Sequence, residues 1–216
     1  MPLPMVHLAV AVQLADKSNH YPSPAFLLGS IAPDAIHMRP GSDRNHKEIT
    51  HLNSPTDTDD HRQVRDMLVK WTSNPSPVKP FAAGYAAHIL VDRLWIKTIV
   101  RPFQTSVPAE IDENQIKHLY YQETDQIDCN LYKNMTWREA VWENLRCAEA
   151  PDYQPWLTAS EIAGWQIRTL DWYDNPAHEP GIHAHYITDA QVERFITAAA
   201  QDLHTQFSAW DLDGVV

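Results

Sequence analysis

The chain has 216 residues, of which 44% are hydrophobic, and carries a formal net charge of −11 from 17 basic and 28 acidic side chains. This length can bury a substantial core without disulfide or metal cross-links, so we expect a single domain over residues 1–216. The acidic charge argues against a protein that binds nucleic acid through its phosphates, because such binding needs clusters of Lys and Arg.

Helical patterns follow one another along the chain, separated by clusters of proline. Three of them begin with capping-box spacing, in which Thr136, Thr158 and Thr188 each stand three residues before a Glu or Gln. No segment alternates with period two, so an all-α fold is predicted, a bundle of about seven helices. In chain order these helices cover about residues 5–16, 59–73, 81–101, 112–133, 136–145, 158–173 and 188–207.

Two long segments, about residues 17–58 and 174–187, show no helical periodicity and are predicted to be irregular. Irregular segments of this length inside a compact domain are usually functional loops. We therefore expect them to contribute residues to a site.

The sequence carries no sign of export or of a membrane span. Its apolar start lacks a basic n-region and contains His7 and Gln13, so a signal peptide is not expected. No window approaches the roughly 18 apolar residues of a membrane-spanning helix. Cys129 and Cys147 have neither zinc-site spacing nor the pattern of a disulfide framework, which favours a reducing compartment. A cytoplasmic location is predicted.

A histidine and an aspartate, His88 and Asp92, interrupt the stretch FAAGYAAHILVDRLW, which is otherwise almost wholly apolar. On a helix, positions four apart lie on one face, about 5 to 6 Å from each other. A buried carboxylate must become neutral, find a charged partner or bind a metal. Taken alone, the pair has an ordinary structural explanation, as a contact between His88 and Asp92 or between Asp92 and Arg93.

Three further polar residues stand in apolar surroundings earlier in the chain. They are His7 in MVHLAVAV, Asp34 in LLGSIAPDAIH and His51 in KEITHL. Alone, a core histidine or a turn aspartate would explain them. Together with His88 and Asp92 they form a set of imidazoles and carboxylates, the ligand mixture that suits zinc or another first-row divalent metal.

Four ordered motifs, MVHLAVA, FLLGSIAPDAIH, ITHL and GYAAHILVDRLW, resemble the zinc-dependent phospholipase C family over about residues 1–100. This family has an all-helical metallohydrolase fold that is shared with secreted zinc nucleases. The resemblance implies that Asp34, His51, His88 and Asp92 hold one ion. It also implies that Asp92 bridges towards a second ion, for which His7 and the mature N-terminal amine are ligands in the family. Here Met1 precedes Pro2 at that terminus.

The sequence departs from the family pattern after Asp92. Family members with three zinc ions have a further histidine soon after this helix, and then a His-x-x-x-Glu helix. Here RLWIKTIV contains no histidine, and Gln122 stands four residues after His118. We therefore expect one or two ions. Nearby, Glu123, Asp125 and Asp128 are either substitute ligands or an ordinary solvated helix face.

Three loop histidines also have alternative explanations. His37 follows Asp34 by three residues and would either orient a ligand or be exposed. His183 and His185 precede the last predicted helix, where they would bind metal, line a pocket or face solvent.

These patterns predict a metal-dependent, zinc-type hydrolase of a phosphoester, most simply a phosphodiesterase or a phospholipase C-like enzyme. Asp34 is the candidate general base, and a small soluble phosphoester is the expected substrate. The alternative is a non-catalytic helical protein with a structural or sensing metal site. A third interpretation is a purely structural helical domain with buried ion pairs.

Overall fold

The computed structural model describes residues 3–17, 20–53, 61–72 and 78–212. Within these ranges every regular element is a helix, and the all-α prediction is confirmed. No helix among them combines the length and the hydropathy that crossing a lipid bilayer requires. The α-helices are α1 Pro4–Lys17, α2 Pro24–Gly29, α3 Arg44–Thr50, α4 Arg62–Thr72, α5 Lys79–Trp95, α6 Arg101–Ser106, α7 Glu113–Asn134, α8 Arg138–Cys147, α9 Ala159–Trp172 and α10 Asp189–Ala209. Two 3-10 helices, η1 Ala32–Met38 and η3 Pro176–His178, and one π-helix, η2 Ile96–Val100, complete them.

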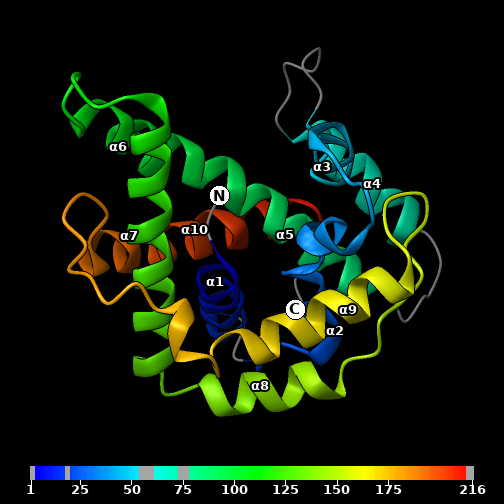
Figure 1. The fold of residues 1–216 in the computed structure, drawn as a ribbon. Helices are drawn as coiled ribbons and strands as arrows, with labels where there is room; N and C mark the ends of the chain where they lie inside the picture. Colours follow the sequence, from blue (N-terminus) through cyan, green and yellow to red (C-terminus); the bar gives the residue numbers. More distant parts are fainter. Residues whose placement is uncertain (1–2, 18–19, 54–60, 73–77, 213–216) are drawn as a thin grey trace.

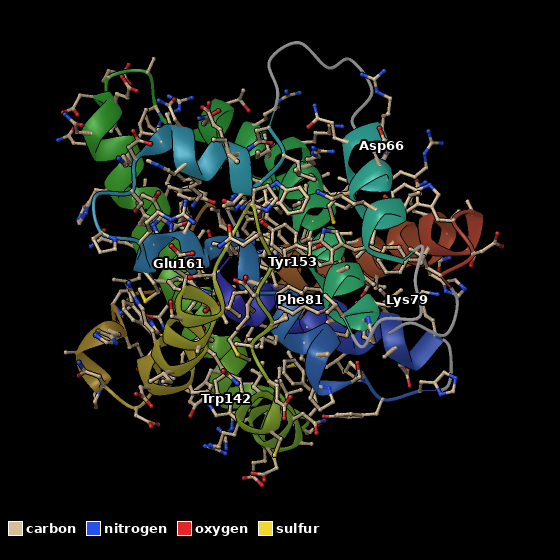
Figure 2. All side chains as sticks on the ribbon, turned by 90° about the vertical axis from the view of Figure 1, so that its right-hand side faces the viewer. Asp66, Lys79, Phe81, Trp142, Tyr153 and Glu161 are labelled. Carbon is tan, nitrogen blue, oxygen red and sulfur yellow. The ribbon has the colours of Figure 1, made fainter. Side chains whose placement is uncertain are left out.

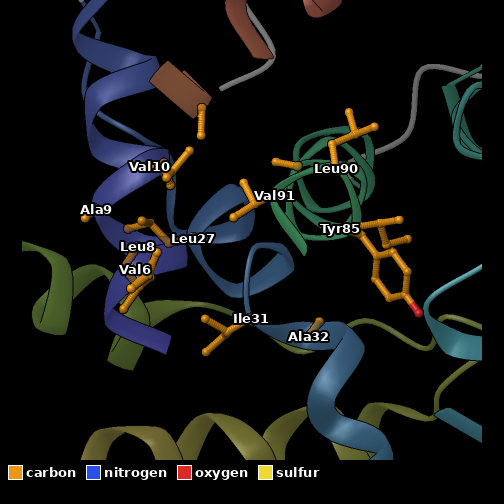
Figure 3. Close-up of a cluster of buried hydrophobic side chains, with 14 of the residues drawn as sticks. Val6, Leu8, Ala9, Val10, Leu27, Ile31, Ala32, Tyr85, Leu90 and Val91 are labelled. Atoms are coloured by element: carbon orange, nitrogen blue, oxygen red, sulfur yellow. The ribbon is translucent and has the colours of Figure 1, made fainter. Parts of the chain in front are cut away.

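Helix α1 lies near the centre of the fold, with α10 and α7 packed against it (Figure 1). Helix α5 is buried on almost all sides and crosses α2, while α9 packs against η1. Figure 3 shows part of this apolar core, where Leu27 of α2 lies between α1 and the side chain of Val91 on α5, with Ile31 below them. Helices α1, α2 and α5 thereby meet in the core.

Two glycines allow α2 and α5 to touch through their backbones. A Cβ atom added at Gly29 would lie 2.1 Å from the carbonyl oxygen of Phe81, and one at Gly84 would lie 2.1 Å from that of Phe26. Only a residue without a side chain fits such an approach. The contact holds the start of η1 against α5 and so determines which side chains of the two elements face each other.

An aromatic group anchors the chain around α5. Figure 2 shows Phe81 and Tyr153 within the molecule and Asp66 near its edge. The rings of Phe81 and Tyr153 meet edge to face with centroids 5.1 Å apart. Next to them, the Tyr85 hydroxyl donates a hydrogen bond of 2.6 Å to the carbonyl of Thr50. This bond ties the end of α3 to α5.

Each of the seven predicted helices has a counterpart, and two of the three capping boxes are confirmed. Thr158 and Thr188 accept hydrogen bonds from the backbone N–H of Glu161 and Gln191. The prediction for Thr136 is wrong, because a tight turn precedes α8 and its N-cap is Trp137, which makes no side-chain cap. An N-cap needs extended backbone, and Trp137 already has helical dihedral angles.

The prediction of an irregular segment over residues 17–58 is wrong for its described part, which contains α2, η1 and α3. The segment 174–187 is irregular apart from η3. The predicted helix 59–73 corresponds to α4, and its predicted ends at 59, 60 and 73 lie outside the described residues. The predicted helix 81–101 continues further, through η2 into α6.

Candidate metal centre

The five predicted residues come together in the core from four elements. His7 comes from α1, Asp34 from η1, His51 directly follows α3, and His88 and Asp92 lie one turn apart on α5. All five are buried. The Nε2 atoms of His7, His51 and His88 lie 3.5, 3.7 and 3.8 Å from the Asp92 carboxylate oxygens, and His51 Nε2 also lies 3.5 Å from Asp34 Oδ1.

The donor atoms form two overlapping triads. In each of them one ligand atom per residue lies within 4.8 Å of the others. The first triad is His7, His88 and Asp92, and the second is Asp34, His51 and His88. The rings of His7 and His88 stack with centroids 3.8 Å apart. His88 therefore belongs to both groups, whereas the family resemblance gives the shared position to Asp92.

Backbone carbonyls fix the orientation of two of the imidazoles. His88 Nδ1 lies 2.8 Å from the carbonyl oxygen of Ser30, and His51 Nδ1 lies 2.9 Å from that of Lys47. A carbonyl oxygen only accepts, so in each neutral ring Nδ1 is the donor and Nε2 carries the free lone pair. This arrangement is typical of histidines that bind metals through Nε2.

Several polar atoms of the centre have no hydrogen-bond partner within the described part of the chain. They are both ring nitrogens of His7, the Nε2 atoms of His51 and His88, and Oδ1 of Asp92. Burying such groups unpaired is costly, and buried polar atoms in native proteins are nearly always satisfied. A cation would accept one lone pair from each of these four residues, so the residues present fit a divalent metal.

Burial and neighbouring charges set the protonation states. Burial, reinforced by His7, lowers the pKa of His88 to about 3, so this ring is neutral at pH 7, the form that binds metals. Burial opposes ionisation of Asp34, but His51, 3.5 Å away, and the Lys47 ammonium outweigh it and hold the pKa of that carboxyl well below its ordinary value. Burial also opposes ionisation of Asp92, and the imidazoles around it, in their protonated form, lower its pKa.

Lys47 is a member of this centre that the sequence did not reveal. Its Nζ donates a hydrogen bond of 3.1 Å to Asp34 Oδ1 and lies 3.2 Å from His37 Nε2. The available signal was its position four residues, about one helical turn, before His51. His37 itself lies at the rim, with an exposed ring whose Nε2 is 3.8 Å from Asp34 Oδ1.

The carboxylates of α7 have other roles than those predicted. Glu123 accepts hydrogen bonds from the backbone N–H groups of residues 185–187. Asp128 accepts hydrogen bonds from the backbone N–H of Met5 and from the Tyr173 hydroxyl. Both side chains are buried, so a solvated helix face is the wrong description for them. Asp125 is half-buried and belongs to neither ligand triad of the described chain.

The remaining predicted histidines lie apart from the centre. His118 is exposed on α7, and His183 and His185 are exposed in the segment before α10. The N-terminal amine, considered above as a ligand, lies outside the described residues.

Comparison of the chain with family models, with curated proteins and with solved structures gives no match. The resemblance to the zinc-dependent phospholipase C family therefore rests on the four sequence motifs. The convergence of their histidines and aspartates in the fold is the observation from which a function has to be inferred.

Proposed function

We propose that this protein is a metal-dependent hydrolase of a phosphoester, most simply a phosphodiester, and that it uses zinc or another first-row divalent metal. The observation that carries the proposal is the convergence of three imidazole Nε2 atoms and one carboxylate oxygen that lack hydrogen-bond partners among the described residues. The two overlapping triads of nitrogen and carboxylate donors support one or two ions.

The ligand count favours catalysis over a structural or sensing site. Each triad offers three protein ligands, and catalytic zinc sites typically keep the fourth position for water or substrate, whereas structural sites have four protein ligands. His88 presents a single unprotonated nitrogen, so with two ions bound one of the triads would supply only its other two ligands. When bound, a divalent ion supplies a water of lowered pKa and stabilises negative charge on phosphoryl oxygens.

The side chains of the chain have distinct tasks in this proposal. His51 and His88 present Nε2 because backbone carbonyls engage their Nδ1 atoms. The low pKa of Asp34 suits a ligand, which must be deprotonated, better than a general base, whose pKa should lie near the working pH. The metal-ligand role of Asp34 is thus better supported than its predicted role as the base.

We infer a small substrate from the burial of the centre. The side chains of His7, His51 and His88 are only 1–2% exposed, which leaves little room for a polymer to reach them. The net charge of −11 also disfavours a polyanion such as nucleic acid. A small soluble phosphoester fits both features, and the cytoplasmic location remains a prediction.

The test combines metal analysis with an activity assay. Purified protein should contain zinc or a similar ion in near-stoichiometric amount and should hydrolyse bis(p-nitrophenyl) phosphate. Chelation and His88→Ala should abolish turnover, while the control His118→Ala, at an exposed histidine of α7, should leave it unchanged. A folded wild type that binds no ion would contradict the proposal. A tightly bound ion with four protein ligands and no turnover would favour the structural or sensing alternative.

A further inference from the structure

We propose that Lys47 binds a phosphoryl oxygen of the substrate at the entrance to the metal centre and thereby selects anionic esters. This inference rests on the proposed function. It starts from the contacts of the Lys47 ammonium, which donates to Asp34 Oδ1 at 3.1 Å and lies 3.2 Å from His37 Nε2. Lys47 is not one of the candidate metal ligands, so binding of the metal does not require it.

Side-chain exposure identifies where a substrate approaches. The imidazoles of His51 and His88 are 2% and 1% exposed, whereas the side chains of Asp34, Lys47 and His37 are 12%, 29% and 44% exposed. Solvent therefore reaches the centre at the corner that these three residues form. A ligand that enters there meets the Lys47 ammonium before it reaches the imidazoles.

The charges at this corner favour an anion. Asp34 accepts from Lys47 through Oδ1 and is also a candidate metal ligand, and metal–oxygen bonds are about 2.0–2.2 Å long. An ion bound by the same Oδ1 atom would therefore lie within about 5 Å of Lys47 Nζ, by the sum of the two lengths. Two positive charges at this separation repel each other. A phosphoryl group, with several anionic oxygens, can contact both cations and remove the repulsion.

The neighbouring surface extends this positive character. The guanidinium of Arg168 lies over the rings of Trp165 and Trp172, 5.3 and 5.4 Å from their centroids. Trp165 in turn lies 5.9 Å from the ring of His37. Two acidic side chains of α3 and α9 are already paired, Glu48 with Arg44 and Glu161 with Arg39. An incoming anion thus meets Lys47 and Arg168 within a protein that is acidic as a whole.

A purely structural Lys47, paired with Asp34, makes different predictions. Substitution of such a residue would change stability or metal content and leave the affinity for phosphate untouched. Substitution of a substrate-binding lysine would leave the metal in place and weaken the binding of anions. Inorganic phosphate serves as the probe, as a competitive inhibitor and as a ligand.

The experiment compares Lys47→Met and Lys47→Arg with the control Arg44→Met in zinc-loaded protein. Arg44 is on the same helix, and its side chain is 91% exposed and paired with Glu48. For Lys47→Met, the KM for bis(p-nitrophenyl) phosphate and the inhibition constant of phosphate should rise about 10- to 100-fold, the range expected for loss of a charged hydrogen bond. Lys47→Arg should restore part of the affinity, and Arg44→Met should behave as wild type.

A second measurement uses the wild type alone, in case Lys47→Met does not fold. Phosphate should protect Lys47 of zinc-loaded protein from acetylation, as read by mass spectrometry, and should leave exposed Lys117 unprotected. Three results would each overturn the role of Lys47. They are an unchanged KM and inhibition constant in Lys47→Met, loss of metal from Lys47→Met, and no protection of Lys47 from acetylation by phosphate in the wild type. Failure of the proposed function is seen separately, as a wild type that binds no metal or that binds metal without turnover. In the second case the acetylation result still decides whether Lys47 binds phosphate.

Discussion

The substitution Asp92→Asn tests whether the buried centre is a set of metal ligands or a network of ion pairs. Without metal, the Asp92 carboxylate lies 3.5–3.8 Å from the Nε2 atoms of His7, His51 and His88, beyond ordinary hydrogen-bond lengths. In the neutral rings of His51 and His88 the Nδ1 atoms donate to backbone carbonyls, so the Nε2 atoms that face Asp92 are acceptors. An asparagine amide adds two donors and removes a buried charge.

Metal-free Asp92→Asn should therefore be more stable than metal-free wild type. Relieving an unsatisfied buried acceptor is worth about 1–3 kcal/mol. For a chain of 216 residues this raises Tm by about 2–12 °C, at about 2–4 °C per kcal/mol. With zinc the order should reverse. Zinc at 1,000 times its Kd stabilises wild type by about 4 kcal/mol, or about 8–16 °C, and the variant lacks the anionic ligand that this gain requires.

The assay is thermal unfolding at pH 8 of both proteins, in chelator and in a series of zinc concentrations. Asp66→Asn, at an exposed residue of α4, controls for the loss of one negative charge and should match wild type in both conditions. A variant that is less stable than wild type in chelator would mean that Asp92 is well paired within the protein. Equal stabilisation of both proteins by zinc would mean that Asp92 binds no ion. Either result would refute the reasoning that assigns a metal to this centre.

Two further predictions concern stability without metal. Burial raises the pKa of Asp128 to about 7, against the opposing effect of its hydrogen bonds from Tyr173 and Met5. Between about pH 4 and about pH 7 the folded state therefore keeps a proton that the unfolded chain has lost, so wild type should lose stability relative to Asp128→Asn as pH rises through this range. Denaturant titrations at several pH values would detect this loss. A stability difference between the two proteins that does not change with pH would contradict the prediction. In the second prediction, Gly84→Ala forces a Cβ against the Phe26 carbonyl and should lower the free energy of unfolding by about 1–3 kcal/mol or more, as measured by chemical denaturation. The control Gly164→Ala meets only the Met38 side chain, at 3.4 Å, and should be neutral or stabilising. Equal effects of the two substitutions would refute the close crossing of α2 and α5.

The long helices were predictable because their signals are local. Helices α9 and α10 combine apolar spacing with a Thr and a Glu or Gln three residues apart, and the structure has both capping boxes. Helices α2 and α3 are only 6 and 7 residues long, too short for an apolar face to repeat. The capping box of α3 pairs Asp43 with His46 in place of a Glu or Gln, so its sequence signature is also unusual.

The five residues of the candidate centre were found because each is polar within an apolar run. Lys47, Glu123 and Asp128 offered no such contrast, since they stand in polar stretches. The partners that explain the two carboxylates come from far along the chain. Glu123 binds backbone groups 62 to 64 residues away, and Asp128 binds the N–H of Met5, 123 residues away. Contacts of this kind depend on the tertiary fold and leave no pattern in the local sequence.

The use of these carboxylates also bears on the number of ions. In the family that the sequence resembles, a His-x-x-x-Glu helix helps to bind a third zinc ion. In this chain His118 of α7 is exposed. Glu123 and Asp128 accept hydrogen bonds from backbone N–H groups. Carboxylate oxygens that already accept several hydrogen bonds are poorly available to a metal. Asp128 instead holds the first turn of α1, two residues before His7. Helix α7 therefore contributes to the centre by positioning the helix that carries His7, which is consistent with one or two ions between α1, η1 and α5.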